Sequence, residues 1–104
     1  MKRVKLPVPR ERIAEFCRKW HVIEFNLFGS VLRDDFRAES DVDVLLRFAP
    51  GHGIGFDNRV EMEDELAAIF GRKVDLVEHG AIRNPFRRQS IMNTREVIYA
   101  AARA

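Results

Sequence analysis

The sequence contains only one cysteine among its 104 residues. That residue, Cys17, cannot form a disulfide within the chain, and unpaired thiols are typical of proteins in the reducing cytosol. The sequence also contains no uninterrupted apolar run near the roughly 20 residues needed to cross a bilayer. The basic residues at its start are not followed by the apolar stretch of a secretory signal. We therefore expect a cytoplasmic protein without a membrane segment.

An excess of one charge is also missing. The net charge is +2, because 18 basic residues nearly balance 16 acidic ones. A charge this small does not by itself indicate a nucleic-acid-binding protein. The apolar fraction of 46% is sufficient for a core, and no segment resembles a linker or a repeat. We therefore expect a single domain over residues 1–104.

Hydrophobic periodicity and turn residues predict alternating helices and strands. The predicted helices cover 10–20, 31–34, 57–70 and 85–92, and the predicted strands cover 22–28, 41–48, 73–78 and 96–99. The residues of the third helix that are expected to face the core are Val60, Leu66, Ala67 and Phe70. This order predicts an α/β (α+β) domain in which helices back one face of a short mixed sheet. The other face is left to carry polar residues and the active site.

Asp41 and Asp43 are two residues apart in the predicted strand 41–48, so their side chains leave the same face of the sheet. Two carboxylates this close repel each other unless a cation lies between them. Mg²⁺ is typically held by one or two carboxylates together with substrate phosphates. Exposed strands also alternate polar residues, so an Asp-x-Asp pattern alone indicates a solvent face more often than a metal site.

The context of this pattern favours the metal site. The strand is otherwise composed of Val, Leu and Phe with one Arg, a composition more usual in a central strand than at an edge. A third carboxylate, Asp75, lies near the start of the apolar strand 73–78. If the two strands are neighbours, Asp41, Asp43 and Asp75 converge, which is sufficient for a two-metal site.

A glycine and a serine stand where the first predicted strand gives way to the short helix. Gly29 lacks the side chain that would block close approach, and the free N–H groups at a helix start attract phosphate. Gly and Ser are also common in ordinary turns, so Gly29-Ser30 alone is a weak signal. Its combination with Asp41-Val42-Asp43 after a gap of ten residues is specific.

The span 27–45, which holds both motifs, closely resembles the signature of the polymerase-beta-type nucleotidyltransferase superfamily. More narrowly, it resembles the minimal nucleotidyltransferase (MNT) antitoxin group, in which Arg33 and Ser40 occupy typical positions. The segment 73–77 resembles the strand that bears the third carboxylate, and the segment 84–99 resembles the short tail of the family. The resemblance therefore covers almost the whole chain and implies the polymerase-beta-like fold.

The resemblance also implies roles for these residues. Gly29 and Ser30 would hold the triphosphate of a bound nucleotide, and Arg33 and Ser40 would complete the nucleotide-binding site. The catalytic and metal-binding residues would be the three carboxylates, Asp41, Asp43 and Asp75. Asp41 and Asp43 would bind two Mg²⁺ ions, for which Mn²⁺ is an alternative. Asp75 would bind one ion and help to activate the acceptor hydroxyl.

Members of the antitoxin group are usually encoded beside a HEPN-type ribonuclease toxin, which they silence by adding AMP from ATP to a tyrosine. The resemblance therefore implies that ATP and such a toxin are the partners of this chain. Two alternatives remain open: a nucleotidyltransferase that acts on RNA or tRNA, and a binding-only antitoxin with a vestigial nucleotide site. The lack of a separate RNA-binding segment and the intact carboxylate set favour the first interpretation.

Two charged groups lie outside these motifs. A basic group near the C-terminus, consisting of Arg83, Arg87, Arg88 and Arg95, is explained by a solvated helix face or by a docking surface for RNA or an acidic partner. The acidic residues of the helix 57–70 are most simply its outer side. They are Glu61, Glu63, Asp64 and Glu65.

Overall fold

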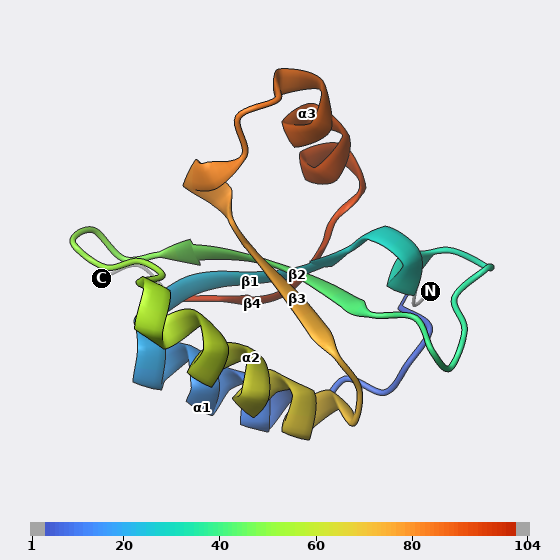
Figure 1. Ribbon diagram of the computed structural model, residues 1–104, viewed down its shortest axis with the longest axis horizontal. Coiled ribbons are helices and arrows are strands. Elements are labelled where there is room, and N and C mark those ends of the chain that lie inside the picture. The colour runs from blue at the N-terminus through green and yellow to red at the C-terminus, as the bar shows by residue number, and fades with distance from the viewer. Residues whose placement is uncertain (1–3, 102–104) are drawn as a thin grey trace.

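The computed structural model describes residues 4–101, which form a four-stranded sheet with helices on both sides (Figure 1). The elements in chain order are α1 (Arg10–Trp20), β1 (Val22–Phe28), η1 (Gly29–Leu32), β2 (Val42–Phe48), α2 (Phe56–Phe70), β3 (Val74–Glu78), η2 (His79–Ala81), α3 (Pro85–Thr94) and β4 (Glu96–Ala100). The predicted order of helices and strands is confirmed. The short helix predicted at 31–34 begins earlier, at Gly29, and is a 3₁₀ helix.

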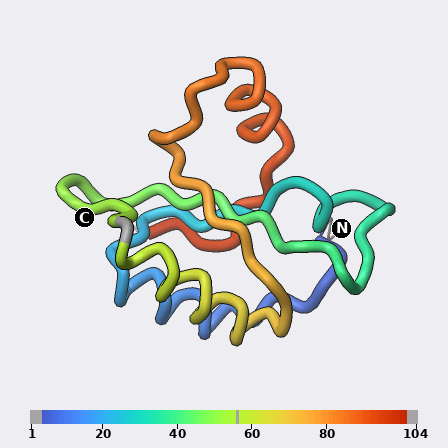
Figure 2. The backbone as a smooth tube through the Cα atoms, viewed as in Figure 1, coloured from blue at the N-terminus to red at the C-terminus, as the bar shows by residue number. Residues whose placement is uncertain are grey.

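The strands lie in the order β3-β2-β1-β4. β1 pairs antiparallel with both β2 and β4, whereas β2 and β3 run parallel. The chain passes from β2 to β3 through α2, which can be followed in Figure 2. This arrangement confirms the predicted mixed sheet, and it makes β2 a central strand with β3 at the edge beside it.

α1 and α2 cover one face of the sheet (Figure 1). The residues of β2 alternate, so Val42, Val44 and Leu46 enter the main core beneath these helices. Cys17 of α1 is fully buried in this core, as expected for a packing residue. Its burial raises the pKa of the thiol to about 12. Among residues 4–101, no helix has the length and apolar character that crossing a bilayer requires.

The expected orientation of α2 is wrong at one residue. Val60 was expected to face the core, but 63% of its surface is exposed. The fully buried residues of α2 are Met62 and Leu66, which lie four positions apart on one face of the helix. Val60 lies two positions before Met62, about 200° away around the helix, and therefore points to solvent.

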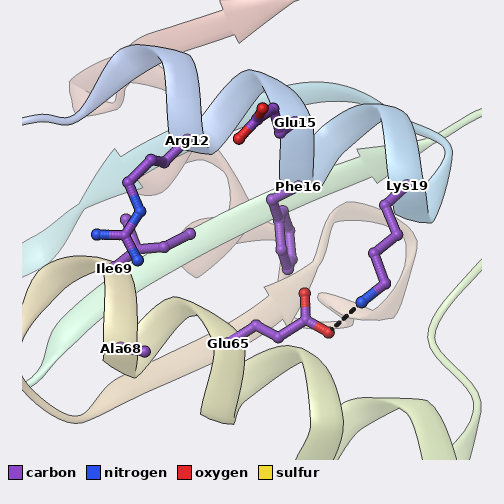
Figure 3. Close-up of a pocket in the computed structure, with 7 residues that line it drawn as sticks. All are labelled: Arg12, Glu15, Phe16, Lys19, Glu65, Ala68 and Ile69. Atoms are coloured by element: carbon purple, nitrogen blue, oxygen red, sulfur yellow. Dashed lines mark hydrogen bonds and ion pairs between the residues drawn. The ribbon is translucent and has the colours of Figure 1, made fainter.

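On their outer side, α1 and α2 are joined by a charged contact. Lys19 Nζ lies 2.6 Å from Glu65 Oε2, and Trp20 Nε1 donates a hydrogen bond of 3.1 Å to Glu65 Oε1. Figure 3 shows Lys19 reaching across to Glu65, with Phe16 between the two helices. A cavity of about 310 Å³ lies between α1 and α2, on the opposite side of the sheet from α3.

α3 lies on the opposite side of the sheet from α1 and α2 (Figure 1). Ile82 and Ile91 form a second cluster there with Phe28 of β1 and Leu45 of β2. With the partly buried Val77 of β3, these two strand residues form an apolar area on the face that carries Asp43, so burying them favours the approach of α3. The side chain of Asn84 accepts hydrogen bonds from the backbone N–H groups of residues 86 and 87 and fixes the first turn of the helix.

We predict that this second cluster anchors α3. Ile91→Ala should lower the free energy of unfolding by at least about 2 kcal/mol, because it removes a buried side chain and leaves a cavity. Phe86→Ala on the same helix is the matched control: Phe86 is 85% exposed, so the change should be within about 0.5 kcal/mol. Urea unfolding of both variants measures the difference. Equal effects would show that α3 is not held by this cluster.

Candidate active site

The sheet register brings two of the predicted carboxylates into direct opposition. Asp43 is paired with Asp75 across the parallel β2–β3 ladder and with Phe28 across the antiparallel β1–β2 ladder. Asp41 lies just before β2 and is two residues from Asp43. The three residues predicted from the sequence are therefore brought together around Asp43, on the face that α3 also occupies.

The electrostatics of Asp43 confirm that these charges are neighbours. The pKa of Asp43 is raised above its ordinary value, first by burial and then by the negative charges of Asp75 and Asp41. The positive charges of Arg33 and Arg87 act in the opposite direction and lower it. Because the upward causes prevail, the charged form of Asp43 is insufficiently compensated by the protein itself.

Gly29 is required by the position of Asp43. Its φ of +75° lies in the left-handed region, and a Cβ atom at this position would overlap Asp43 Oδ2. Any side chain here would displace the carboxylate or the backbone. Gly29 and Ser30 thus begin η1 directly against the central carboxylate, as the sequence motif predicted for the phosphate-binding turn.

Arg33 and Ser40 lie on the loop between η1 and β2. Arg33 Nε contacts Asp35 Oδ1 at 3.2 Å, and its charge is close enough to act on Asp43. The Ser40 hydroxyl accepts a hydrogen bond of 3.0 Å from the backbone N–H of Arg37, which closes a turn before Asp41. The contact between Ser40 and a nucleotide therefore stays a prediction, while its contribution to the shape of the loop is visible.

The C-terminal arginines have different roles. Arg88 donates two hydrogen bonds to the carbonyl oxygen of Ile82, and Arg95 donates one to that of Met92. Arg87 instead acts electrostatically on Asp43, so α3 contributes a cation to the site. The sequence did not distinguish Arg87 from its neighbours, because only the position of α3 brings it to the carboxylates.

A cavity of about 390 Å³ lies between η1 and α3. Phe28, Leu32 and Ile91 form the apolar part of its lining. The remaining lining residues are Gly29 and Arg33 near η1 and Ser90 and Thr94 of α3. Because Gly29 lines the cavity and lies directly against Asp43, the cavity is next to the candidate site.

Asp75 is more exposed than Asp43, with 53% of its side chain accessible, and its Oδ1 lies 3.7 Å from Arg59 Nη2. Within residues 4–101, no group of three or more His, Cys, Asp or Glu side chains is arranged to hold a metal ion. The donor set nevertheless fits a divalent cation, because Asp41, Asp43 and Asp75 are hard oxygen donors whose charges already act on one another. A cation between them would relieve the repulsion that raises the pKa of Asp43.

Comparison with known proteins places this site in a family. Residues 10–98 match the nucleotidyltransferase domain family. A protein of Methanocaldococcus jannaschii that is provisionally named a protein adenylyltransferase is 40% identical over 75 residues, which cover 70% of this chain and 72% of the relative. The protein adenylyltransferase MntA of Thermococcus cleftensis is 31% identical over 85 residues, which cover 82% and 81% of the two chains.

Two solved structures share the fold. One is a toxin–antitoxin structure with AMP-PNP, which has a TM-score of 0.73 and 19% identity and covers 90% of this chain and 75% of its own. The other contains a tri-AMPylated HEPN toxin of Shewanella oneidensis in complex with an MNT antitoxin, with a TM-score of 0.64 and 19% identity over 88% and 70% of the chains. Together with the match over residues 10–98, these findings show that the chain belongs to the nucleotidyltransferase domain family, whose polymerase-beta-type members use divalent metals.

Proposed function

We propose that this chain is a Mg²⁺-dependent protein adenylyltransferase, the antitoxin of a HEPN/MNT pair, which transfers AMP from ATP to a tyrosine of its ribonuclease toxin. The observation that carries the proposal is the register that sets Asp43 opposite Asp75 and against Gly29. This arrangement unites a cation-binding carboxylate pair with a phosphate-binding turn, which is the minimum that nucleotidyl transfer requires.

The named relatives support the acceptor and the partner. The relative from Thermococcus cleftensis is named a protein adenylyltransferase, which indicates that the acceptor is a protein. The structural neighbours are a toxin–antitoxin assembly with AMP-PNP and a complex that contains an AMPylated HEPN toxin. The ATP analogue corresponds to the substrate, and the AMPylated toxin to the product, of the reaction that we propose for this chain.

Each site residue has a role that follows from its position. Asp41, Asp43 and Asp75 would hold two Mg²⁺ ions, or Mn²⁺ in their place, which supply positive charge to the triphosphate and to the carboxylates. Gly29 and Ser30 would hold the triphosphate at the start of η1. Arg33 and Ser40 would contact the nucleotide from the neighbouring loop.

The transfer step is an in-line displacement at the α-phosphate. The acceptor tyrosine oxygen forms a bond to the α-phosphorus while the bond from that phosphorus to the oxygen bridging to the β-phosphate breaks. Pyrophosphate leaves with that oxygen. Asp75 would accept the proton of the tyrosine hydroxyl, because it is the most exposed of the three carboxylates and can be approached from solvent.

We predict that incubation with ATP and Mg²⁺ raises the intact mass of the HEPN-type toxin that we propose as the partner of this chain by one or more AMP units. Intact-mass spectrometry, followed by peptide mapping to a tyrosine, measures the transfer. Asp43→Asn is the control and should give no mass gain. Neutralisation of the toxin without any mass change would instead support a binding-only antitoxin, and label found on RNA would support the RNA-directed alternative.

A second prediction concerns the stability of the metal-free protein. Asp43→Asn should raise the melting temperature at neutral pH, or at least not lower it, because the raised pKa of Asp43 means that its charged form destabilises the fold. The folded state binds this proton more tightly than the unfolded chain. The wild type therefore loses stability as pH rises from the ordinary value of 3.8 through the raised pKa, and the two proteins should converge in acid.

Thermal unfolding of both proteins in chelator across this pH range measures whether Asp43→Asn raises or lowers the melting temperature. The stabilisation by Mg²⁺ plus ATP should also be smaller in Asp43→Asn than in the wild type. If Asp43 were instead a structural hydrogen-bond acceptor, its replacement would destabilise the fold by roughly 1–3 kcal/mol. A melting temperature several degrees lower, with transfer activity preserved, would contradict the metal-site assignment.

A further inference from the structure

β3 is an edge strand. At one of its residues, side chains of α2 form hydrogen bonds with the backbone groups that face away from β2. Glu63 Oε2 accepts a hydrogen bond of 3.3 Å from the backbone N–H of Leu76, and Arg59 Nη2 donates one to the carbonyl oxygen of Leu76. Both outward backbone groups of this residue are therefore satisfied. We call Arg59 and Glu63 the α2–β3 clamp.

The two members of the clamp also hold each other. Arg59 and Glu63 are four residues apart on α2, and Arg59 Nε lies 3.5 Å from Glu63 Oε2. This spacing places both side chains on the same face of the helix, directed at β3. The clamp therefore binds both outward backbone groups of one residue of the edge strand.

The position that the clamp grips is directly after Asp75. Arg59 Nη2 also lies 3.7 Å from Asp75 Oδ1, so one guanidinium contacts both the carboxylate and the backbone that carries it. Asp75 is in turn paired in register with Asp43. Any movement of β3 at Leu76 would thus change how Asp75 faces the central carboxylate.

We propose that Arg59 and Glu63 are positioning residues that hold Asp75 in place for metal binding beside Asp43. The inference rests on the proposed function, in which Asp75 is a metal ligand. The negative charges of Asp75 and Asp43 repel each other, which favours movement of Asp75 away from Asp43. Because β3 is an edge strand, only one neighbouring strand opposes that movement. The positive charge of Arg59 and the two backbone hydrogen bonds oppose it.

A purely structural role would be to hold α2 on the sheet, but α2 has other anchors. Met62 and Leu66 are fully buried in the main core, and Glu65 joins α2 to α1 through Lys19 and Trp20 (Figure 3). Arg59 has 43% of its side chain exposed, and ion pairs at such sites contribute little stability. Loss of the clamp should therefore change the site more than the stability of the fold.

The first test uses the metal-free protein and needs no activity. Exchange of the Leu76 amide, followed by NMR, should be about tenfold faster in Glu63→Ala, because the hydrogen bond that protects this amide is lost. Glu65→Ala is the matched control on the same helix, since Glu65 contacts α1 and not β3. It should leave the exchange of Leu76 unchanged.

The second test measures Mn²⁺ binding and turnover. Arg59→Met should weaken Mn²⁺ binding in the presence of ATP by about tenfold, as expected for a residue that orients a metal ligand. At saturating Mn²⁺ it should lower kcat by a similar factor and leave KM for ATP within about twofold, because the triphosphate binds at η1. Arg59→Lys keeps the charge and one donor and should recover part of the loss.

Two results would overturn the inference: unchanged exchange at Leu76 in Glu63→Ala, or Mn²⁺ binding in Arg59→Met that is unchanged or tighter. Tighter binding would show that Arg59 competes with the metal for Asp75. The proposed function can fail separately. If the wild type transfers no AMP to any protein while clamp variants still lose Leu76 protection and Mn²⁺ affinity, the positioning role stands and only the assigned reaction is wrong.

Discussion

The mutual repulsion of Asp41, Asp43 and Asp75 is the constraint on which the rest of the structure depends. The register that sets Asp43 opposite Asp75 places like charges on neighbouring central and edge strands, and the pKa of Asp43 is raised first by its burial and then by these charges. Burial of apolar side chains offsets this repulsion, because the opposite face of the same strands supplies buried Val and Leu side chains to the main core. One short strand, β2, thereby serves both stability and chemistry.

The positive charges around the site come from elements that are far apart in the sequence. Arg33 follows η1 and Arg87 belongs to α3, and both act on Asp43. Arg59 belongs to α2 and contacts Asp75. Arg87 reaches the site only because Ile82 and Ile91 pack α3 against Phe28 and Leu45. These cations partly offset the negative charge of the carboxylates, which leaves the charge of a divalent cation as the remaining compensation.

Local patterns in the sequence predicted the elements and the motif residues, because these depend on periodicity and on close spacing. The position of α3 differs from the expectation that helices back only one face of the sheet, because Phe28, Leu45 and Val77 make part of the other face apolar. The exposure of Val60 was missed because its seven-residue spacing from Ala67 suited an inward face, whereas the fully buried Met62 and Leu66 show which face of α2 meets the core. Glu63 was assigned to the outer side of α2 and Arg59 was not singled out, since nothing local shows that they contact the backbone of β3.

The central claim is that the three carboxylates bind a divalent cation together with a nucleotide. Calorimetric titration of ATP into the wild type, with Mg²⁺ and then with excess chelator, tests it most directly. The account predicts measurable binding with Mg²⁺ and its loss in chelator, because the triphosphate and the carboxylates repel each other without a cation between them. Equal ATP affinity under both conditions would contradict it.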